Sequence, residues 1–68
     1  MEINYEAWFG EELLYSGYDK KEMINEIEDF IRFNSYEGFE SLSEEDIENV
    51  NRKALSDVGI KVYANCVK

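Results

Sequence analysis

Residues 2–18, EINYEAWFGEELLYSGY, decide the fold, because they alternate like a half-buried strand and then turn back on themselves. The apolar side chains of the first half fall on one phase of the alternation: Ile3, Tyr5, Ala7 and Phe9. This period of two predicts a strand over residues 2–9. Gly10 and Glu11 follow with glycine first, which is the preference of a type II′ hairpin turn. The segment therefore predicts a β-hairpin.

The expected hairpin register places Phe9 opposite Glu12 and Ala7 opposite Leu14. Large apolar groups then gather on the other face of the sheet, where no helix is expected: Trp8, Leu13, Tyr15 and Tyr63. Trp and Tyr are frequent interface anchors, so we predict that this aromatic face binds a partner or forms a dimer. Two alternatives stay open at this stage. Another part of the chain covers the face, or a slip in register turns these residues into core.

Two helix starts follow the hairpin. Asp19 and Glu22 form a capping box, and the helix that they begin should run to about Asn34. Its buried stripe recurs at helical spacing: Met23, Ile24, Ile27, Phe30 and Ile31, with Phe33 widening it on one side. A second capping box, Ser43 with Asp46, predicts a second helix.

The buried face of this second helix should be made by Ile47, Val50, Ala54, Leu55 and Val58, with Gly59 as its left-handed cap. Residues 35–42 between the helices show neither period, so we expect a loop from which Tyr36 and Phe39 fold back onto the core.

A last alternating segment predicts a strand that returns to the hairpin, with Ile60, Val62, Ala64 and Cys66 on its apolar phase. Cys66 should therefore be a small buried hydrophobe. The resulting fold class is α+β, with the order ββααβ and two helices packed on one face of a three-stranded sheet. Residues 1–68 form one domain, because a chain this short has room for one core.

The charge is strongly negative and unevenly placed. Sixteen acids oppose seven bases, for a net charge of −9. Between Glu22 and Glu48 ten acids stand against one base, Arg32. This balance disfavours direct binding to nucleic acid or to an anionic membrane. The chain has no long apolar run, and its start lacks the features of a secretory signal, so we expect a cytosolic protein.

Residues that carry catalysis or bind metals are scarce. The chain has no histidine, its glycines are scattered, and its acids do not match a calcium loop. A single cysteine allows neither an intramolecular disulfide nor a CxxC pair. We therefore expect no enzyme activity, no catalytic residue, no metal site and no cofactor.

The acids of the two helices and the loop between them should form one negative side of the molecule: Glu22, Glu26, Asp29, Glu37, Glu40, Glu44, Glu45 and Glu48. We predict that this acidic face docks onto the nucleic-acid-binding surface of a basic protein. The plain alternative is that these acids are solvated helix faces that maintain solubility.

With Glu22, Glu26, Glu28 and Asp29 on one helix and Glu44, Glu45, Asp46 and Glu48 on the next, the chain resembles in size and composition the small acidic inhibitors of phages and mobile elements. Anti-CRISPR proteins, anti-restriction proteins and uracil-DNA glycosylase inhibitors belong to this class. The resemblance implies a nucleic-acid mimic that occupies the site of a basic enzyme, in a host cytosol. Two rivals remain: a homodimeric structural or adaptor domain that associates through the aromatic face, and an antitoxin-like neutraliser of a basic toxin.

Overall fold

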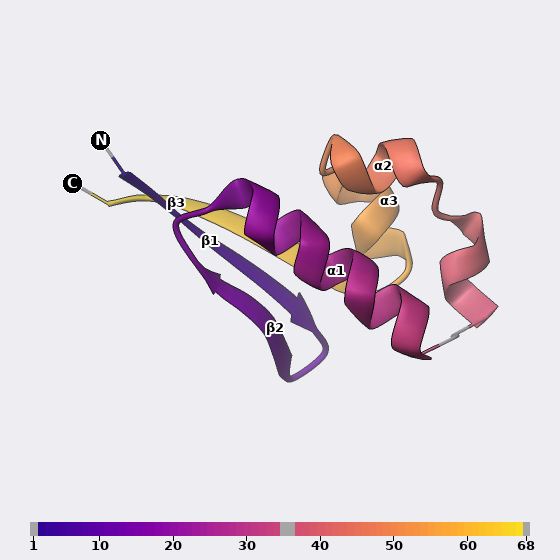
Figure 1. The fold of residues 1–68 in the computed structure, drawn as a ribbon. Helices are drawn as coiled ribbons and strands as arrows, with labels where there is room; N and C mark the ends of the chain where they lie inside the picture. Colours follow the sequence, from indigo (N-terminus) through magenta and orange to yellow (C-terminus); the bar gives the residue numbers. More distant parts are fainter. Residues whose placement is uncertain (1, 35–36, 68) are drawn as a thin grey trace.

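A three-stranded antiparallel sheet forms one layer of the molecule, and helices form the other (Figure 1). The computed structural model describes residues 2–34 and 37–67, apart from the side chains of Glu37 and Val67. The strands are β1 (Glu2–Phe9), β2 (Glu12–Gly17) and β3 (Ile60–Val67), and they lie in the order β2-β1-β3. The first strand is therefore central, paired with the hairpin strand on one side and the last strand on the other.

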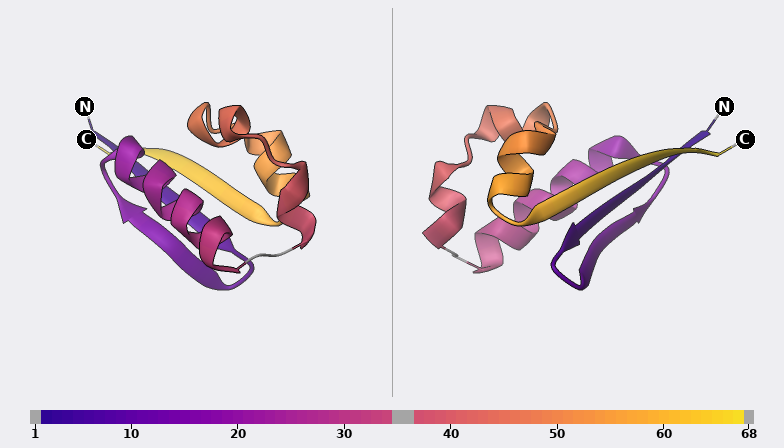
Figure 2. Two further views of the ribbon diagram at one scale, coloured as in Figure 1. Left: turned by 45° about the vertical axis from the view of Figure 1, so that its right-hand side comes forward. Right: turned by 180° about the vertical axis from the view of Figure 1, so that it is seen from behind.

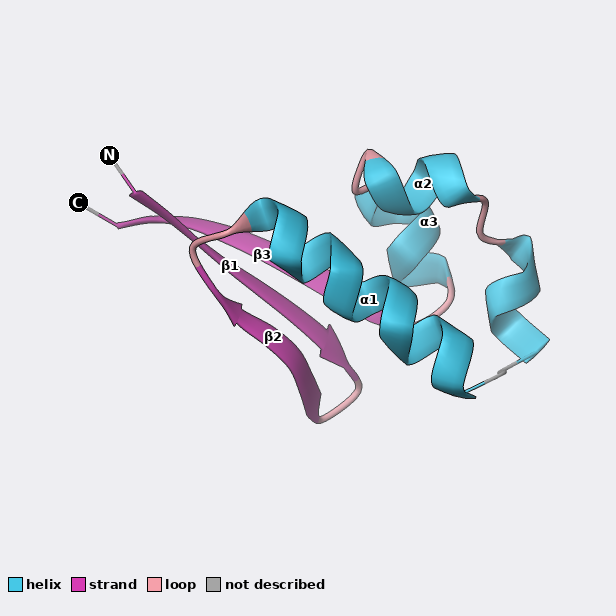
Figure 3. Cartoon of the chain, in the orientation of Figure 1, coloured by secondary structure: helices cyan, strands magenta, loops and turns pink. Residues whose placement is uncertain are grey.

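The helices all lie on the same face of the sheet (Figures 2 and 3). The helical elements are α1 (Lys20–Asn34), the 3-10 helix η1 (Glu37–Ser41), α2 (Glu44–Glu48) and α3 (Arg52–Asp57). Helix α1 packs on β1 and β2, while α3 packs on β3. The predicted α+β class and the three-stranded sheet with helices on one face are confirmed.

The core lies between the sheet and the helices, and both layers contribute buried side chains to it. Its buried members are Ala7, Met23, Ile27, Phe39, Ile47, Leu55, Ile60 and Val62. Phe9, Phe30 and Phe39 meet at one end, with ring centroids 5.1 to 5.9 Å apart in tilted and edge contacts. The prediction that Phe39 folds back onto the core is confirmed, since it is 6% exposed. The same prediction for Tyr36 falls outside the described residues.

The side chains of Asp19 and Ser43 cap their helices as expected, but the Glu22 half of the first capping box does not form, because the Asp19 N–H donates to the Tyr15 hydroxyl. The Asp19 Oδ1 atom accepts hydrogen bonds from the backbone N–H groups of Lys21 and Glu22, at 2.9 and 3.3 Å. The Ser43 hydroxyl accepts from the Asp46 N–H, and Asp46 Oδ2 accepts from the Ser43 N–H, which completes the second capping box. Gly59 has φ +96°, as its predicted left-handed position requires.

The predicted single second helix is wrong, because the structure divides it into α2 and α3. Val50 stands at the break with φ +50°. Asn49 caps the end of α2, and the Asn51 side chain accepts a hydrogen bond from the Ala54 N–H at 3.2 Å to cap the start of α3. An asparagine side chain competes with the helical backbone for hydrogen bonds, so Asn51, two residues after Asn49, favours a new helix start.

The predicted hairpin register is correct at Phe9–Glu12 and at Trp8–Leu13, and wrong from Ala7 onward. Trp8 lies opposite Leu13, but Ala7 lies opposite Tyr15, because Leu14 is the extra residue of a β-bulge. The bulge lets Leu14 and Tyr15 both pack against the core. Tyr15 therefore belongs to the helix-covered face, where its hydroxyl accepts from the Asp19 N–H at 3.1 Å. Its predicted place on the outer aromatic face is wrong.

The prediction that Cys66 is buried is also wrong. Cys66 has the expected phase, opposite Ile3 on β1, yet its thiol is exposed. Ile3 itself is 38% exposed. The cause is that this end of β1 and β3 extends beyond α1, so no helix covers it (Figure 1).

Candidate functional site

A groove runs between β2 and α1 and has an apolar floor with an acidic rim. It has a volume of about 320 Å³. Its lining, which defines the β2–α1 groove, comprises Glu12, Leu13, Leu14, Glu26, Asp29, Phe30, Phe33 and Asn34. Phe33 is 81% exposed, so a large apolar side chain stands open to water beside the carboxylates. Such exposed apolar area within a polar rim is typical of an interaction surface.

The carboxylates of this groove are mostly free of cationic partners. Across the described residues the one ion pair joins Asp29 to Arg32, at 3.5 Å between exposed side chains. An exposed pair of this kind contributes at most about 1 kcal/mol. Glu12 and Glu26 make no such pair, and neither does Glu22 one helical turn before Glu26. The groove therefore carries a net negative charge.

The single acidic side predicted from the sequence is in the structure two groups on opposite flanks of α1. Glu26 and Asp29 line the β2–α1 groove, whereas Glu44 lines a separate groove between α1 and α2, together with Glu28 and Arg32. Helix α1 lies between β2 and α2, so acids that project from its two flanks are kept apart. The prediction of one continuous acidic face is therefore corrected to two surfaces.

The other predicted acids lie apart from the β2–α1 groove or serve the fold. Glu40, Glu45 and Glu48 are exposed on η1 and α2, and the side chain of Glu37 is outside the described part. The pKa of the Asp46 carboxyl is lowered from its usual value, chiefly by the hydrogen bond from the Ser43 backbone N–H. The side chains of Asn51 and Ser43 lower it further. Asp46 is thus a structural acid of the α2 cap.

The outer face of the sheet retains three of the four predicted side chains. Trp8 lies between Leu13 on β2 and Lys61 on β3, and Tyr63 lies next along β3. Tyr63 is 49% exposed, and Trp8 is half-buried with its indole N–H donating to Glu6 Oε1 at 3.1 Å. Since the described helices lie on the opposite face, this smaller aromatic patch is open in the described structure.

Sequence reasoning missed the two residues that complete the β2–α1 groove, Phe33 and Glu12. Phe33 was expected only to widen the buried stripe of its helix. The available signal was its spacing, because Phe33 follows Glu26 by seven residues, or two helical turns, and so shares the side of the acids. Glu12 reaches the groove because it pairs with Phe9, on the helix-covered side of the sheet.

Neither a metal centre nor a membrane span is found within the described ranges. No three histidine, cysteine, aspartate or glutamate side chains there are grouped so as to hold a metal ion. None of the helices described has the length and apolarity to cross a bilayer.

The comparisons with known proteins returned no match: no protein family, no curated protein and no solved structure is significantly similar to this chain.

Proposed function

We propose that this chain is a cytosolic, non-enzymatic inhibitor that binds a basic nucleic-acid-binding protein and occupies the surface with which that protein holds DNA or RNA. The observation that supports this proposal is the β2–α1 groove. There, the Phe33 ring is exposed among carboxylates, and only Asp29 has a cationic neighbour. Free carboxylates beside exposed apolar groups suit a cationic protein surface far better than they suit nucleic acid.

The spacing of the charges supports mimicry of a nucleic acid. Glu22 and Glu26 stand one turn apart on α1, which corresponds to about 6 Å of rise. Successive phosphates on one DNA strand are about 3.4 Å apart along the helix axis, so the two charge densities are of the same order. A protein channel lined by lysine and arginine would be attracted to this flank and blocked by it.

The apolar floor adds what a bare acidic surface lacks. Lysine and arginine carry apolar stems beneath their charged ends, and a guanidinium stacks favourably on an aromatic ring. Phe33 offers such a ring next to the carboxylates of Glu26 and Asp29. The groove can therefore hold both parts of a basic side chain, while the acids on α2 contribute a longer-range attraction that raises the association rate.

The test starts from capture on the immobilised chain in a lysate of cells that carry its gene, at low and at high salt. A captured protein is then purified and bound to a labelled oligonucleotide, and the chain is added as competitor. We expect displacement of the oligonucleotide and a steep loss of affinity with salt. A captured partner that keeps its oligonucleotide at saturating amounts of this chain would contradict the proposal.

A pair of double variants locates the interface. Glu22→Gln with Glu26→Gln should weaken inhibition about tenfold, because one charge in the groove and another one helical turn away are lost. Glu45→Gln with Glu48→Gln removes the same charge from α2 and should weaken it about twofold or less, through the association rate alone. Equal effects of the two doubles would show that the groove is not the interface.

A second candidate function rests on the outer sheet face. Trp8, Leu13 and Tyr63 form an uncovered patch on which a second copy of the chain could pack, as in a homodimeric adaptor domain. Sedimentation at micromolar concentration distinguishes the two functions. A dimer that Trp8→Ala dissociates supports the adaptor, and a monomer supports the inhibitor. An antitoxin-like role would use the same acidic groove against a basic toxin.

A further inference from the structure

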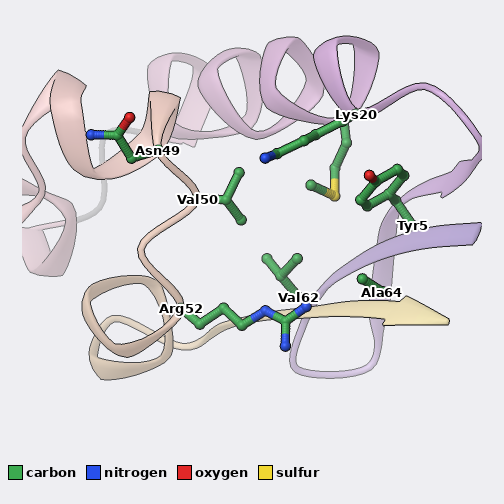
Figure 4. A pocket seen from close by; sticks show the side chains of 8 residues that line it. Tyr5, Lys20, Asn49, Val50, Arg52, Val62 and Ala64 are labelled. Carbon is green, nitrogen blue, oxygen red and sulfur yellow. The ribbon is translucent and has the colours of Figure 1, made fainter. Parts of the chain in front are cut away.

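A separate hollow lies where the start of α1, the connection between α2 and α3, and strand β3 meet (Figure 4). Its volume is about 250 Å³. Its lining, which defines the Lys20–Arg52 pocket, comprises Tyr5, Lys20, Met23, Asn49, Val50, Arg52, Val62 and Ala64. No acid lines this pocket, although the chain holds sixteen acids and seven bases. The charge of the pocket lining is therefore opposite in sign to the charge of the β2–α1 groove.

Four polar groups at the pocket are able to donate hydrogen bonds. Lys20 reaches in from α1 and Arg52 from the start of α3, on opposite sides of the pocket in Figure 4. The Tyr5 hydroxyl adds a neutral donor, whereas the Asn49 amide points away from the other lining side chains in Figure 4. Within the described residues none of these four side chains has a hydrogen-bond or ion-pair partner. Lys20 and Arg52, on opposite sides of the pocket and without internal partners, can form the polar half of a ligand site.

The rest of the lining is apolar and well anchored. Met23 is fully buried and Val62 is 9% exposed, so both belong to the core and form a fixed floor. Val50 closes one side with φ +50°, a conformation that a β-branched residue rarely adopts and that costs free energy. The strain is maintained by backbone bonds on both sides, from Val50 to Ile47 and from Asn51 to Asp46. Strained backbone of this kind is concentrated at functional sites.

We propose that the Lys20–Arg52 pocket binds a small organic anion, with its carboxylate or phosphate group between Lys20 and Arg52 and its apolar body against Met23, Val50 and Val62. Arginine pairs with either oxyanion through two parallel hydrogen bonds, and lysine adds a second positive charge. Sites for drug-sized molecules usually begin at about 300 Å³, so the ligand is no larger than one ring or a short chain. This inference does not depend on the proposed inhibition, because it uses neither the same residues nor the same charge.

The pocket is tested by following backbone amide shifts of the isotope-labelled chain in an NMR titration. The probes are phenylacetate, phenyl phosphate, inorganic phosphate and the neutral phenylacetamide. We expect saturable shifts around Lys20, Val50 and Arg52 with at least one phenyl anion, and the tighter of the two identifies the preferred acid group. Phenylacetamide should bind at least about tenfold more weakly than phenylacetate, because it cannot form the charge-assisted bonds. Inorganic phosphate should also bind more weakly than phenyl phosphate, since it leaves the apolar floor unused.

Two variants and two matched controls decide the assignment. Lys20→Gln and Arg52→Gln should each weaken binding of the better phenyl anion about tenfold or more. Lys21→Gln and Lys53→Gln change the net charge equally, one residue further along the same helices, and should weaken it less than about twofold. The proposal is overturned if the phenyl anions give no saturable shifts, if phosphate alone binds as tightly as phenyl phosphate, or if the control variants match the pocket variants.

Discussion

The β2–α1 groove and the Lys20–Arg52 pocket are hollows of similar size against the same helix, yet they carry opposite charge. The groove presents Glu12, Glu26 and Asp29, and the pocket presents Lys20 and Arg52. A net charge of −9 therefore describes the whole chain and not its separate surfaces. Lys20 stands just before the acidic window of residues 22–48 and Arg52 just after it, and the fold brings these two edges together beside β3.

The largest change in stability is expected on α1, where a buried core residue can be compared with the exposed ring of the β2–α1 groove. Ile27 is fully buried on α1, so Ile27→Ala should lower the free energy of unfolding by about 2–5 kcal/mol. Phe33→Ala on the same helix should change it by about 0.5 kcal/mol or less, because Phe33 is 81% exposed.

Urea denaturation of the two variants measures both values. A cost above about 1 kcal/mol for Phe33→Ala would mean that Phe33 packs onto the protein in solution, so that the groove has no free aromatic anchor.

A change in stability of intermediate size is expected at Val50, the residue with positive φ in the wall of the Lys20–Arg52 pocket. Val50→Gly and Val50→Ala remove the same apolar contact, but only glycine adopts φ +50° without a steric penalty. Val50→Gly should therefore be more stable than Val50→Ala by about 1 kcal/mol, as measured by thermal unfolding.

The matched control is Val58, which has a φ of −102°. There the order should reverse, with the glycine variant less stable than the alanine variant, because glycine loses more chain entropy on folding. If the glycine variant is less stable than the alanine variant at Val50 as well, the left-handed turn at Val50 is absent in solution.

The smallest change in stability is expected at the carboxylates. It should distinguish acids that stabilise the fold, such as Asp46, from acids that are free to bind a partner. The folded pKa of Asp46 lies below its ordinary value of 3.8, so its stabilisation is present above pH 3.8 and is lost as the pH falls through the folded pKa. Asp46→Asn should therefore lower the melting temperature at neutral pH, and the gap to the unmodified chain should narrow below pH 3.8.

Glu26→Gln is the comparison for this variant. Glu26 has no ion-pair partner in the described structure and stands one turn from Glu22, so its loss should leave stability unchanged or raise it by a few tenths of a kcal/mol. Melting curves recorded from pH 7 to pH 3 give both results. A destabilised Glu26→Gln variant would place that carboxylate among the structural acids.

Features that depend on near neighbours could be predicted from the sequence. The alternation of residues 2–9, the glycine turn after Phe9 and the caps at Asp19 and Ser43 each involve groups only a few residues apart. Their hydrogen bonds and periodicity are set by the local chain, so strands, helix starts and the layer of helices were anticipated. The acidic composition of α1 was likewise plain.

The features that could not be predicted depend on contacts between segments that are distant in the chain. The bulge at Leu14 depends on packing beneath α1, and the division of the acids depends on β2 and α2 flanking that helix. The exposure of Cys66 depends on how far α1 reaches along the sheet. Periodicity determines which side of an element is apolar, but contacts between elements determine what covers that side. Local patterns were therefore enough to predict the three strands, α1 and the acidic composition, whereas contacts between elements placed acids around one hollow and bases around the other.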